Sequence, residues 1–278
     1  MRRDRLDRRQ ILAGGLSLAT LAAVGATARA ENALRGAFVQ GTLIRGRTAP
    51  GASVTVDGRK LGLSANGDFA FGFAYDRKDA AELRIKLASG SVETKSIPVA
   101  TREYKIQRID GLPEKYVEPP ASVLKRIERD NRLIGGARAR DTDEAWFADD
   151  FAWPVKGPVT GVFGSRRILN GAEKRPHFGV DIAVGTGTPI HAPVGAIVAM
   201  AEPDLYFTGG TVILDHGHGV STSYLHMSRL DVTVGDRVEK GGVIGAVGKT
   251  GRATGPHLCW RLNWFAERLD AALVVPKA

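Results

Sequence analysis

The stretch Pro176–Trp260 decides how this chain folds and what it can bind. It opens with Pro176-His177-Phe178-Gly179-Val180-Asp181, passes through Ser223-Tyr224-Leu225-His226-Met227 and closes with Gly255-Pro256-His257-Leu258-Cys259-Trp260. All six histidines of the chain and its single cysteine fall within this stretch. Imidazole and thiolate are the ligands that zinc prefers in proteins, and aspartate is a third choice. The stretch therefore predicts a metal site.

The spacing of these residues is typical of strands rather than helices. His177 and Asp181 bracket an alternating apolar pattern, which favours a strand. His257 and Cys259 are two positions apart, so on a strand both side chains leave the same face of a sheet. We expect the two pairs to converge on one ion that is held by rigid elements.

At these residues the sequence resembles the lysostaphin-type (M23, LytM-domain) zinc endopeptidases, which cut peptide cross-links in bacterial cell walls. The signature of that family is His-x-x-x-Asp, then a later His after a short strand, then His-x-His. The same motifs occur here in the same order, and the resemblance covers roughly Trp153–Val275. One position departs from the signature, because the last His of the third motif is Cys259.

The resemblance also implies a role for each motif residue. It assigns zinc binding to His177, Asp181 and the Cys259 position, and catalysis to His226 and His257. A thiolate binds zinc well, but its negative charge is expected to make the metal a weaker Lewis acid. A Cys/His hydrolase built on Cys259 and His257 is an alternative from the residues alone, although it leaves the other motif residues without a role.

The activity implied by the resemblance is hydrolysis of peptide cross-links in bacterial peptidoglycan by a zinc-dependent endopeptidase. In a Gram-negative periplasm the cut bond would be the cross-link from D-alanine to diaminopimelate. The alternative is a catalytically inactive relative that activates a cell-wall amidase, which the altered third motif brings into consideration. The expected partners are therefore peptidoglycan and, under the alternative, a cell-wall amidase.

Residues 1–30 have the pattern of an export signal. A start rich in arginine precedes the mild apolar run Ile11–Ala26, and Ala28-Arg29-Ala30 is a small-x-small cleavage site. Arg8-Arg9-Gln10-Ile11-Leu12 resembles a twin-arginine signal. An uncleaved membrane anchor is the alternative, but the run is rich in Gly and Ala and close to the ~18-residue minimum. We expect a cleaved chain with no stable membrane span, in the periplasm or secreted.

Charge and cysteine content narrow the possible functions. The formal net charge is +9, and residues 1–30 hold six Arg and two Asp, which leaves +5 for the cleaved chain. No basic stripe with interleaved aromatic residues is present, so we expect no nucleic-acid partner. A single cysteine cannot form an internal disulfide, and its place in the third motif favours a ligand.

Residues 36–110 predict a small β-sandwich with six or seven short strands, for which the immunoglobulin type is a candidate. Val54 and Val56 alternate before Asp57-Gly58, which is a hairpin turn signal. Aromatic residues alternate from Phe69 to Tyr75 after a second such signal, Asn66-Gly67. No catalytic constellation occurs in this part, so we expect it to be structural.

Residues 111–150 predict a connector, and residues 151–278 predict the peptidase domain. The connector should contain a helix after Pro119-Pro120 that ends at Gly135-Gly136. The polar segment 137–150 is a candidate to cross or cap the groove of the catalytic domain. Short β runs separated by glycine turns in residues 151–278 predict a compact antiparallel fold. The chain as a whole is therefore expected to be mainly β.

The remaining polar residues near the motifs have less specific signals. The histidines outside the motifs, His191, His216 and His218, are expected to serve structure or loop hydrogen bonding. Arg166, Arg167 and Asn170 precede the first motif. They either line the groove and bind a substrate carboxylate or form a solvated loop, and both interpretations stay open.

Overall fold

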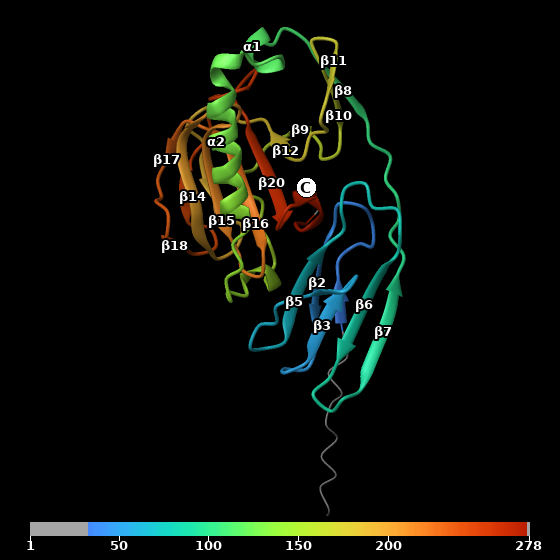
Figure 1. Ribbon diagram of the computed structural model, residues 1–278. Helices are drawn as coiled ribbons and strands as arrows, with labels where there is room; N and C mark the ends of the chain where they lie inside the picture. The colour runs from blue at the N-terminus through green and yellow to red at the C-terminus, as the bar shows by residue number, and fades with distance from the viewer. Residues whose placement is uncertain (1–32, 277–278) are drawn as a thin grey trace, which may run out of the picture. The chain divides into compact units, whose positions relative to one another are not determined.

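Short strands dominate the chain, as its alternating apolar residues and glycine turns predict. The computed structural model describes residues 33–276 (Figure 1), so the predicted export signal lies outside the described part. The described residues belong to one compact unit. None of the helices among them is both long enough and apolar enough to cross a membrane.

The N-terminal part contains seven strands in two sheets. One sheet has the order β1-β2-β5 and the other the order β4-β3-β6-β7. The strands are β1 (Ala33–Arg35), β2 (Leu43–Arg47), β3 (Ser53–Val56), β4 (Arg59–Lys60), β5 (Asp68–Gly72), β6 (Ala81–Lys86) and β7 (Val92–Ile97). Apolar residues of both sheets share one buried core, which is the arrangement expected of a small sandwich.

The hairpin between β3 and β4 follows from its turn residues. Asp57 and Gly58 both have positive φ, at 49° and 77°. Two such residues make the turn whose twist matches the flanking strands, and Asp-Gly is a preferred pair for it. The turn signal that the sequence carries here is therefore confirmed.

One strand crosses from this part to the C-terminal part. Strand β8 (Ile106–Ile109) runs parallel to β10 (Arg166–Leu169), which also pairs with β11 (Ala172–Lys174). A partly buried ion pair of 2.9 Å between Arg102 and Asp270 provides another link. The predicted limits 36–110, 111–150 and 151–278 stay a prediction.

The C-terminal part is organised on an eight-stranded sheet. Its order is β18-β14-β15-β16-β20-β12-β9, and β21 also pairs with β20. The strands are β9 (Val159–Gly161), β12 (Val180–Ile182), β14 (Ala196–Leu205), β15 (Gly209–Asp215), β16 (Val220–Met227), β18 (Arg237–Val238), β20 (Leu258–Trp264) and β21 (Glu267–Leu269). Every neighbouring pair in this sheet is antiparallel, so the predicted mainly β fold is confirmed.

Smaller elements complete the C-terminal part. A three-stranded sheet has the order β13-β19-β17. Its strands are β13 (Pro189–His191), β17 (Arg229–Leu230) and β19 (Val243–Ala246), and two short 3₁₀ helices are η1 (Trp146–Ala148) and η2 (Ala271–Leu273). Every residue of β15 and β16 is buried, because other elements cover both faces of the large sheet.

The predicted helix of the connector is present but longer than expected. It is preceded by the short helix α1 (Glu114–Val117), and α2 (Ala121–Arg138) runs through Gly135-Gly136 instead of ending there. The predicted end was wrong because of tertiary packing. Ala137 is buried against side chains of β14 and β15, on which α2 lies (Figure 1). This packing outweighs a helix penalty of about 1 kcal/mol for each glycine.

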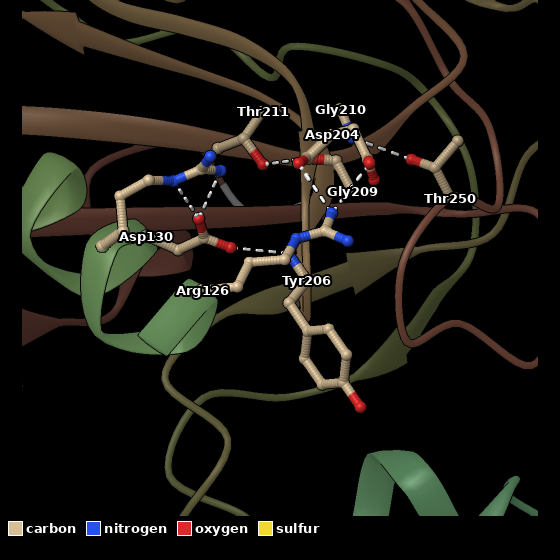
Figure 2. A network of polar contacts seen from close by, with 9 residues as sticks. Arg126, Asp130, Asp204, Tyr206, Gly209, Gly210, Thr211 and Thr250 are labelled. Carbon is tan, nitrogen blue, oxygen red and sulfur yellow. Dashed lines mark hydrogen bonds and ion pairs between the residues drawn. The ribbon is translucent and has the colours of Figure 1, made fainter. Parts of the chain in front are cut away.

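A polar network holds α2 on the hairpin between β14 and β15 (Figure 2). The Asp130 carboxylate is buried and accepts a 2.7 Å hydrogen bond from the backbone N–H of Tyr206. Arg129 pairs with the other carboxylate oxygen at 2.8 Å. Arg126 donates to Asp204 at 2.7 Å. The helix is therefore fixed to the sheet by charge-assisted bonds as well as by apolar contacts.

We predict that Asp130→Ala lowers the free energy of unfolding by about 1–3 kcal/mol, because the buried N–H of Tyr206 loses its acceptor. Urea denaturation measures this change. Asp130→Asn should lower the free energy of unfolding by less, since its amide oxygen can still accept the hydrogen bond from the N–H of Tyr206. Glu128→Ala, an exposed acid on the same helix, is the matched control. Equal effects of Asp130→Ala and Glu128→Ala would contradict the role given to this carboxylate.

Candidate functional site

The three residues expected to bind zinc meet across the paired strands β12 and β20. Asp181 and Cys259 are direct partners in the antiparallel register. His177 Nε2 lies 3.1 Å from Asp181 Oδ1 and 3.3 Å from Cys259 Sγ. One ligand atom from each residue lies within 4.8 Å of the other two, and all three residues are buried. Residues separated by up to 82 positions thus form one cluster.

The protonation states of this cluster suit a cation. Burial lowers the pKa of His177, so its imidazole is neutral. Burial acts to raise the pKa of Asp181, but the nearby His177 and Arg167 outweigh this effect and hold that pKa well below its usual range. Burial and the Asp181 charge raise the pKa of the Cys259 thiol to about 12. A cation at this place is what would favour the thiolate.

The geometry of Asp181 supports the same conclusion. Its Oδ1 atom is buried and has no hydrogen-bond donor among the described residues. The 3.1 Å contact with His177 Nε2 is short, but it does not have hydrogen-bond geometry. A buried carboxylate oxygen without a partner is costly, and a metal ion is one of the few groups that satisfies it. Imidazole, carboxylate and thiol together fit a zinc ion.

Two glycines make room for the ligand side chains. A Cβ at Gly161 of β9 would collide with the carboxylate of Asp181. A Cβ at Gly179 would lie 2.9 Å from Cys259 Sγ. The neighbouring backbone can approach the cluster this closely only because these positions carry no side chain.

The two histidines expected to be catalytic lie beside this cluster. The ring centroids of His226 and His257 are 4.8 Å apart. Each ring donates its Nδ1–H to a backbone carbonyl, at 2.8 Å to Thr250 and 2.9 Å to Gly255. In the neutral form of such a ring, Nε2 is left as the proton acceptor. His257 Nε2 lies 3.8 Å from Asp181 Oδ1.

The backbone and environment of His226 are unusual. Its φ of 66° lies in the left-handed region, which residues other than glycine rarely adopt. Strain of this kind clusters at functional sites, where the surrounding structure maintains it. Burial, together with the neighbouring His257, lowers the pKa of His226 to about 3. The imidazole is therefore neutral at pH 7.

Thr250 fixes the carbonyl group that orients His226. Its hydroxyl accepts a 2.9 Å hydrogen bond from the N–H of Gly210 (Figure 2). The hydroxyl donates one of 2.9 Å to the carbonyl of Met227. Met227 ends β16, the strand that carries His226, and Gly210 lies at the start of the neighbouring strand β15. The acceptor of the His226 ring is thus tied to the sheet by its own side chain.

A pocket of about 1060 Å³ opens over all five motif residues. Helix α2, helix α1 and strand β8 supply part of its lining, as do the segment around β10 and the loop before β20. Segment 137–150 was a candidate to cap this groove, but among the described residues it contributes only Arg138 to the lining. The rest of it packs on the turn after β15, where Phe147 donates its N–H to the carbonyl of His216.

The histidines outside the motifs have structural partners, as expected. His216 is buried, donates Nδ1–H to the carbonyl of Gly195 at 2.9 Å and accepts at Nε2 from the Thr222 hydroxyl at 2.8 Å. His218 packs on Phe147 with ring centroids 4.9 Å apart. His191 donates to a backbone carbonyl. None of the three lines the pocket.

The buried His216 predicts a pH dependence of stability. Burial lowers its pKa from 6.5 to about 4. The unfolded chain takes up a proton near pH 6.5 and the folded chain only near pH 4, so unfolding becomes easier as the pH falls through this interval. His216 alone should lower the free energy of unfolding by about 3 kcal/mol as the pH falls across this interval. We expect His216→Gln to flatten this dependence in urea denaturation, and His191→Gln to leave it unchanged. An unaltered slope in His216→Gln would contradict the prediction.

The arginines near the first motif behave differently from one another. Arg167 lines the pocket, and its Nη2 lies 3.4 Å from Asp181 Oδ2. Arg166 is exposed and pairs with Glu173 at 2.6 Å. Asn170 has a φ of 47° and shapes a turn through its bonds to Leu112. Of the three, only Arg167 reaches the motif residues.

Five other arginines line the pocket without belonging to a motif, namely Arg138, Arg175, Arg252, Arg261 and Arg268. Arg261 could have been found, because it is two positions beyond Cys259 and alternation places both on one face of β20. Arg138 and Arg268 belong to α2 and β21, and no local pattern connects them with the motifs. Tertiary structure alone brings them to the pocket.

The geometry argues against a hydrolase that uses Cys259 as nucleophile. The thiol contacts His177, whereas His257 directs its Nδ1–H to a backbone carbonyl. A reactive cysteine needs a lowered pKa, but burial and Asp181 raise that of Cys259 to about 12. Metal binding is the chemistry that this arrangement supports.

Comparison with known proteins agrees with the arrangement of the motifs. Residues 175–271 match the model of Peptidase family M23, and this segment contains all five motif residues. The chain belongs to peptidase family M23. The resemblance that the motifs carry in the sequence is therefore confirmed.

Relatives in the M23 family extend this comparison. The chain is 39% identical over 136 residues to the peptidoglycan DD-endopeptidase ShyA of Vibrio cholerae, which covers 45% of this chain and 31% of that protein. It is 30% identical over 133 residues to the cell division protein DipM of Caulobacter vibrioides, which covers 46% of this chain and 21% of that protein. The chain thus spans less than a third of either relative.

A solved structure matches more of the fold. A crystal structure of an M23 peptidase from Pseudomonas aeruginosa superposes with a TM-score of 0.67 at 29% identity. The match covers 87% of this chain and 96% of that one. The similarity therefore extends beyond the segment 175–271 into the N-terminal strands.

Proposed function

We propose that this chain is an exported, zinc-dependent endopeptidase that hydrolyses peptide cross-links of bacterial peptidoglycan. The observation that carries the proposal is the convergence of His177, Asp181 and Cys259 beside the imidazoles of His226 and His257 in one pocket. The relative from Vibrio cholerae is named as a peptidoglycan DD-endopeptidase, which supports the same substrate class.

In this proposal His177, Asp181 and Cys259 hold the zinc ion. When bound, zinc supplies a Lewis acid and lowers the pKa of a bound water molecule towards about 7. The surrounding protein orients the three ligand side chains and shields them from solvent, since all three are buried. Arg167 and Arg261 lie near the thiol, and their charges favour its ionised form.

His226 and His257 accept and donate the protons that move during hydrolysis. Their Nδ1–H groups are committed to backbone carbonyls, so each ring can take up a proton only at Nε2. The Nε2 atom of His257 lies 3.8 Å from Asp181 Oδ1 of the cluster. A ring that accepts the proton of the attacking water then becomes a donor. It can hydrogen-bond the oxygen on which charge develops or protonate the leaving amine. The strained backbone of His226 holds its ring in this position.

We predict that His226→Ala keeps its zinc but loses at least about 100-fold in the rate of peptidoglycan cleavage, because it removes a proton acceptor and not a ligand. Metal analysis and product release from purified wall sacculi measure the two effects, and His191→Gln is the control. A wild-type protein that binds no zinc and leaves sacculi uncut would refute the enzyme proposal. That result would instead favour an inactive regulator of a cell-wall amidase.

We predict that Cys259→Ser lowers zinc affinity at least about tenfold, because a hydroxyl is a much poorer zinc ligand than a thiolate. Cys259→His should retain binding, since it restores a nitrogen donor at this place. Competition with a chelator of known affinity measures both variants. Unchanged zinc affinity in Cys259→Ser would remove Cys259 from the ligand set without bearing on the roles of the histidines.

A further inference from the structure

The pocket over the motif residues has an excess of positive charge. Six arginines line it, namely Arg138, Arg167, Arg175, Arg252, Arg261 and Arg268, against the three carboxylates Asp130, Glu173 and Asp181. Each carboxylate already has a partner. Asp130 binds Arg129 and the N–H of Tyr206, Glu173 pairs with Arg166, and Asp181 belongs to the metal cluster. Apart from the contact of Arg167 with Asp181, the arginines are therefore not neutralised from within the pocket.

Arg138, Arg261 and Arg268 form a cluster without ion pairs, in which Arg138 is buried and the other two are half-buried. Within residues 33–276 none of them has an ion pair. Arg138 is only 7% exposed. Each of the three has a guanidinium nitrogen that is shielded from solvent without a hydrogen-bond acceptor: Nε of Arg138, Nε of Arg261 and Nη1 of Arg268.

Such a cluster opposes folding unless something binds to it. Burial, with the charges of Arg268 and Arg261, lowers the pKa of Arg138 well below its usual value. Arginine nevertheless keeps its proton in proteins, so the cost cannot be avoided by deprotonation. An unpaired buried charge is unfavourable for the folded state. One buried and two half-buried guanidinium groups around one pocket, each with a shielded nitrogen that lacks an acceptor, therefore indicate a binding site for an anion.

The cluster lies along the same strand as the candidate metal centre. Arg261 and Cys259 are two positions apart on β20, so their side chains leave one face about 7 Å apart. Strand β21 places Arg268 opposite Asn263, which is four positions beyond Cys259 and roughly 13 Å along the strand. Arg138 reaches the same place from the last turn of α2. An extended peptide at the metal centre would thus meet these guanidinium groups within a few residues.

We propose that Arg138, Arg261 and Arg268 form a carboxylate-binding subsite, which holds a free carboxylate of the peptide substrate within a few residues of the bond that is cut. Guanidinium groups bind carboxylates through paired, charge-assisted hydrogen bonds. The subsite selects an acidic peptide over a neutral one of the same length. This inference rests on the proposed function, which gives the ligand its peptide nature. The unpaired arginines are the reason why the ligand must carry negative charge.

The test compares a cross-linked stem peptide that carries free carboxylates with the same peptide in which they are amidated. Binding is measured at equilibrium with the His226→Ala chain, so that the peptide is not consumed. Amidation should weaken binding by about tenfold, as expected when a charged hydrogen-bond partner is lost. A second substitution in the His226→Ala chain, either Arg138→Gln or Arg268→Gln, should remove most of the preference for the peptide with free carboxylates. Adding Arg229→Gln, an exposed arginine paired with Asp231, should leave it intact.

Several outcomes would overturn the subsite. Equal binding of the two peptides would do so, as would no binding of either peptide, or a preference that survives both Arg138→Gln and Arg268→Gln. A thermal unfolding scan separates binding from structure. Loss of a buried unpaired charge should leave the melting temperature of Arg138→Gln unchanged or higher. A lower melting temperature with the preference intact would instead assign Arg138 a structural role.

Cleavage by the otherwise unaltered chain distinguishes this inference from the proposed function. If the acidic peptide binds through Arg138 but is not cut, the hydrolytic function fails and the subsite stands. If both peptides are cut at equal rates, the hydrolytic function stands and the subsite fails. Inorganic phosphate is the control probe for charge alone, and the subsite predicts that it competes only weakly with the acidic peptide.

Discussion

The site depends on the register between strands β12 and β20. Asp181 lies directly opposite Cys259, and Cys259 lies opposite Leu225 on the other side of β20. Side chains alternate along a strand, so a shift of one residue would carry the sulfur to the far face of the sheet. The pairing β16-β20-β12 thus places the three motifs on adjacent strands, although they are far apart in the chain. Glycines on the neighbouring backbone then let the ligand side chains come together.

The electrostatics of the pocket follow from this packing. Burial keeps the imidazoles of His177 and His226 neutral, and it makes the Cys259 thiol depend on a nearby cation for ionisation. The same burial makes it unfavourable for the guanidinium groups of Arg138, Arg261 and Arg268 to stay without an ion pair. The groove therefore contains metal ligands and proton acceptors at the motif residues, and positively charged guanidinium groups elsewhere in its lining. Both features are unfavourable for the free chain, which is typical of residues that are kept for binding rather than for stability.

Helix α2 connects the wall of the pocket with the sheet beneath it. Its polar contacts hold the β14–β15 hairpin (Figure 2), and its last turn carries Arg138 to the pocket. This arrangement explains why the helix continues past Gly135-Gly136, because ending there would leave Ala137 and Arg138 out of place. Local propensity favoured an earlier end, but burial of the last turn was decisive.

The sequence by itself determined the mainly β fold, the hairpin turns and the five motif residues, because strand alternation, Asp-Gly turns and ligand spacing are local patterns. The same alternation also marks Arg261 as a neighbour of Cys259. Only the tertiary structure decided where α2 ends, that β8 pairs with β10, and that segment 137–150 packs on the turn after β15. It also brought Arg138 and Arg268 beside Arg261. Contacts between distant segments depend on the packing of whole elements, and no spacing within one segment encodes them.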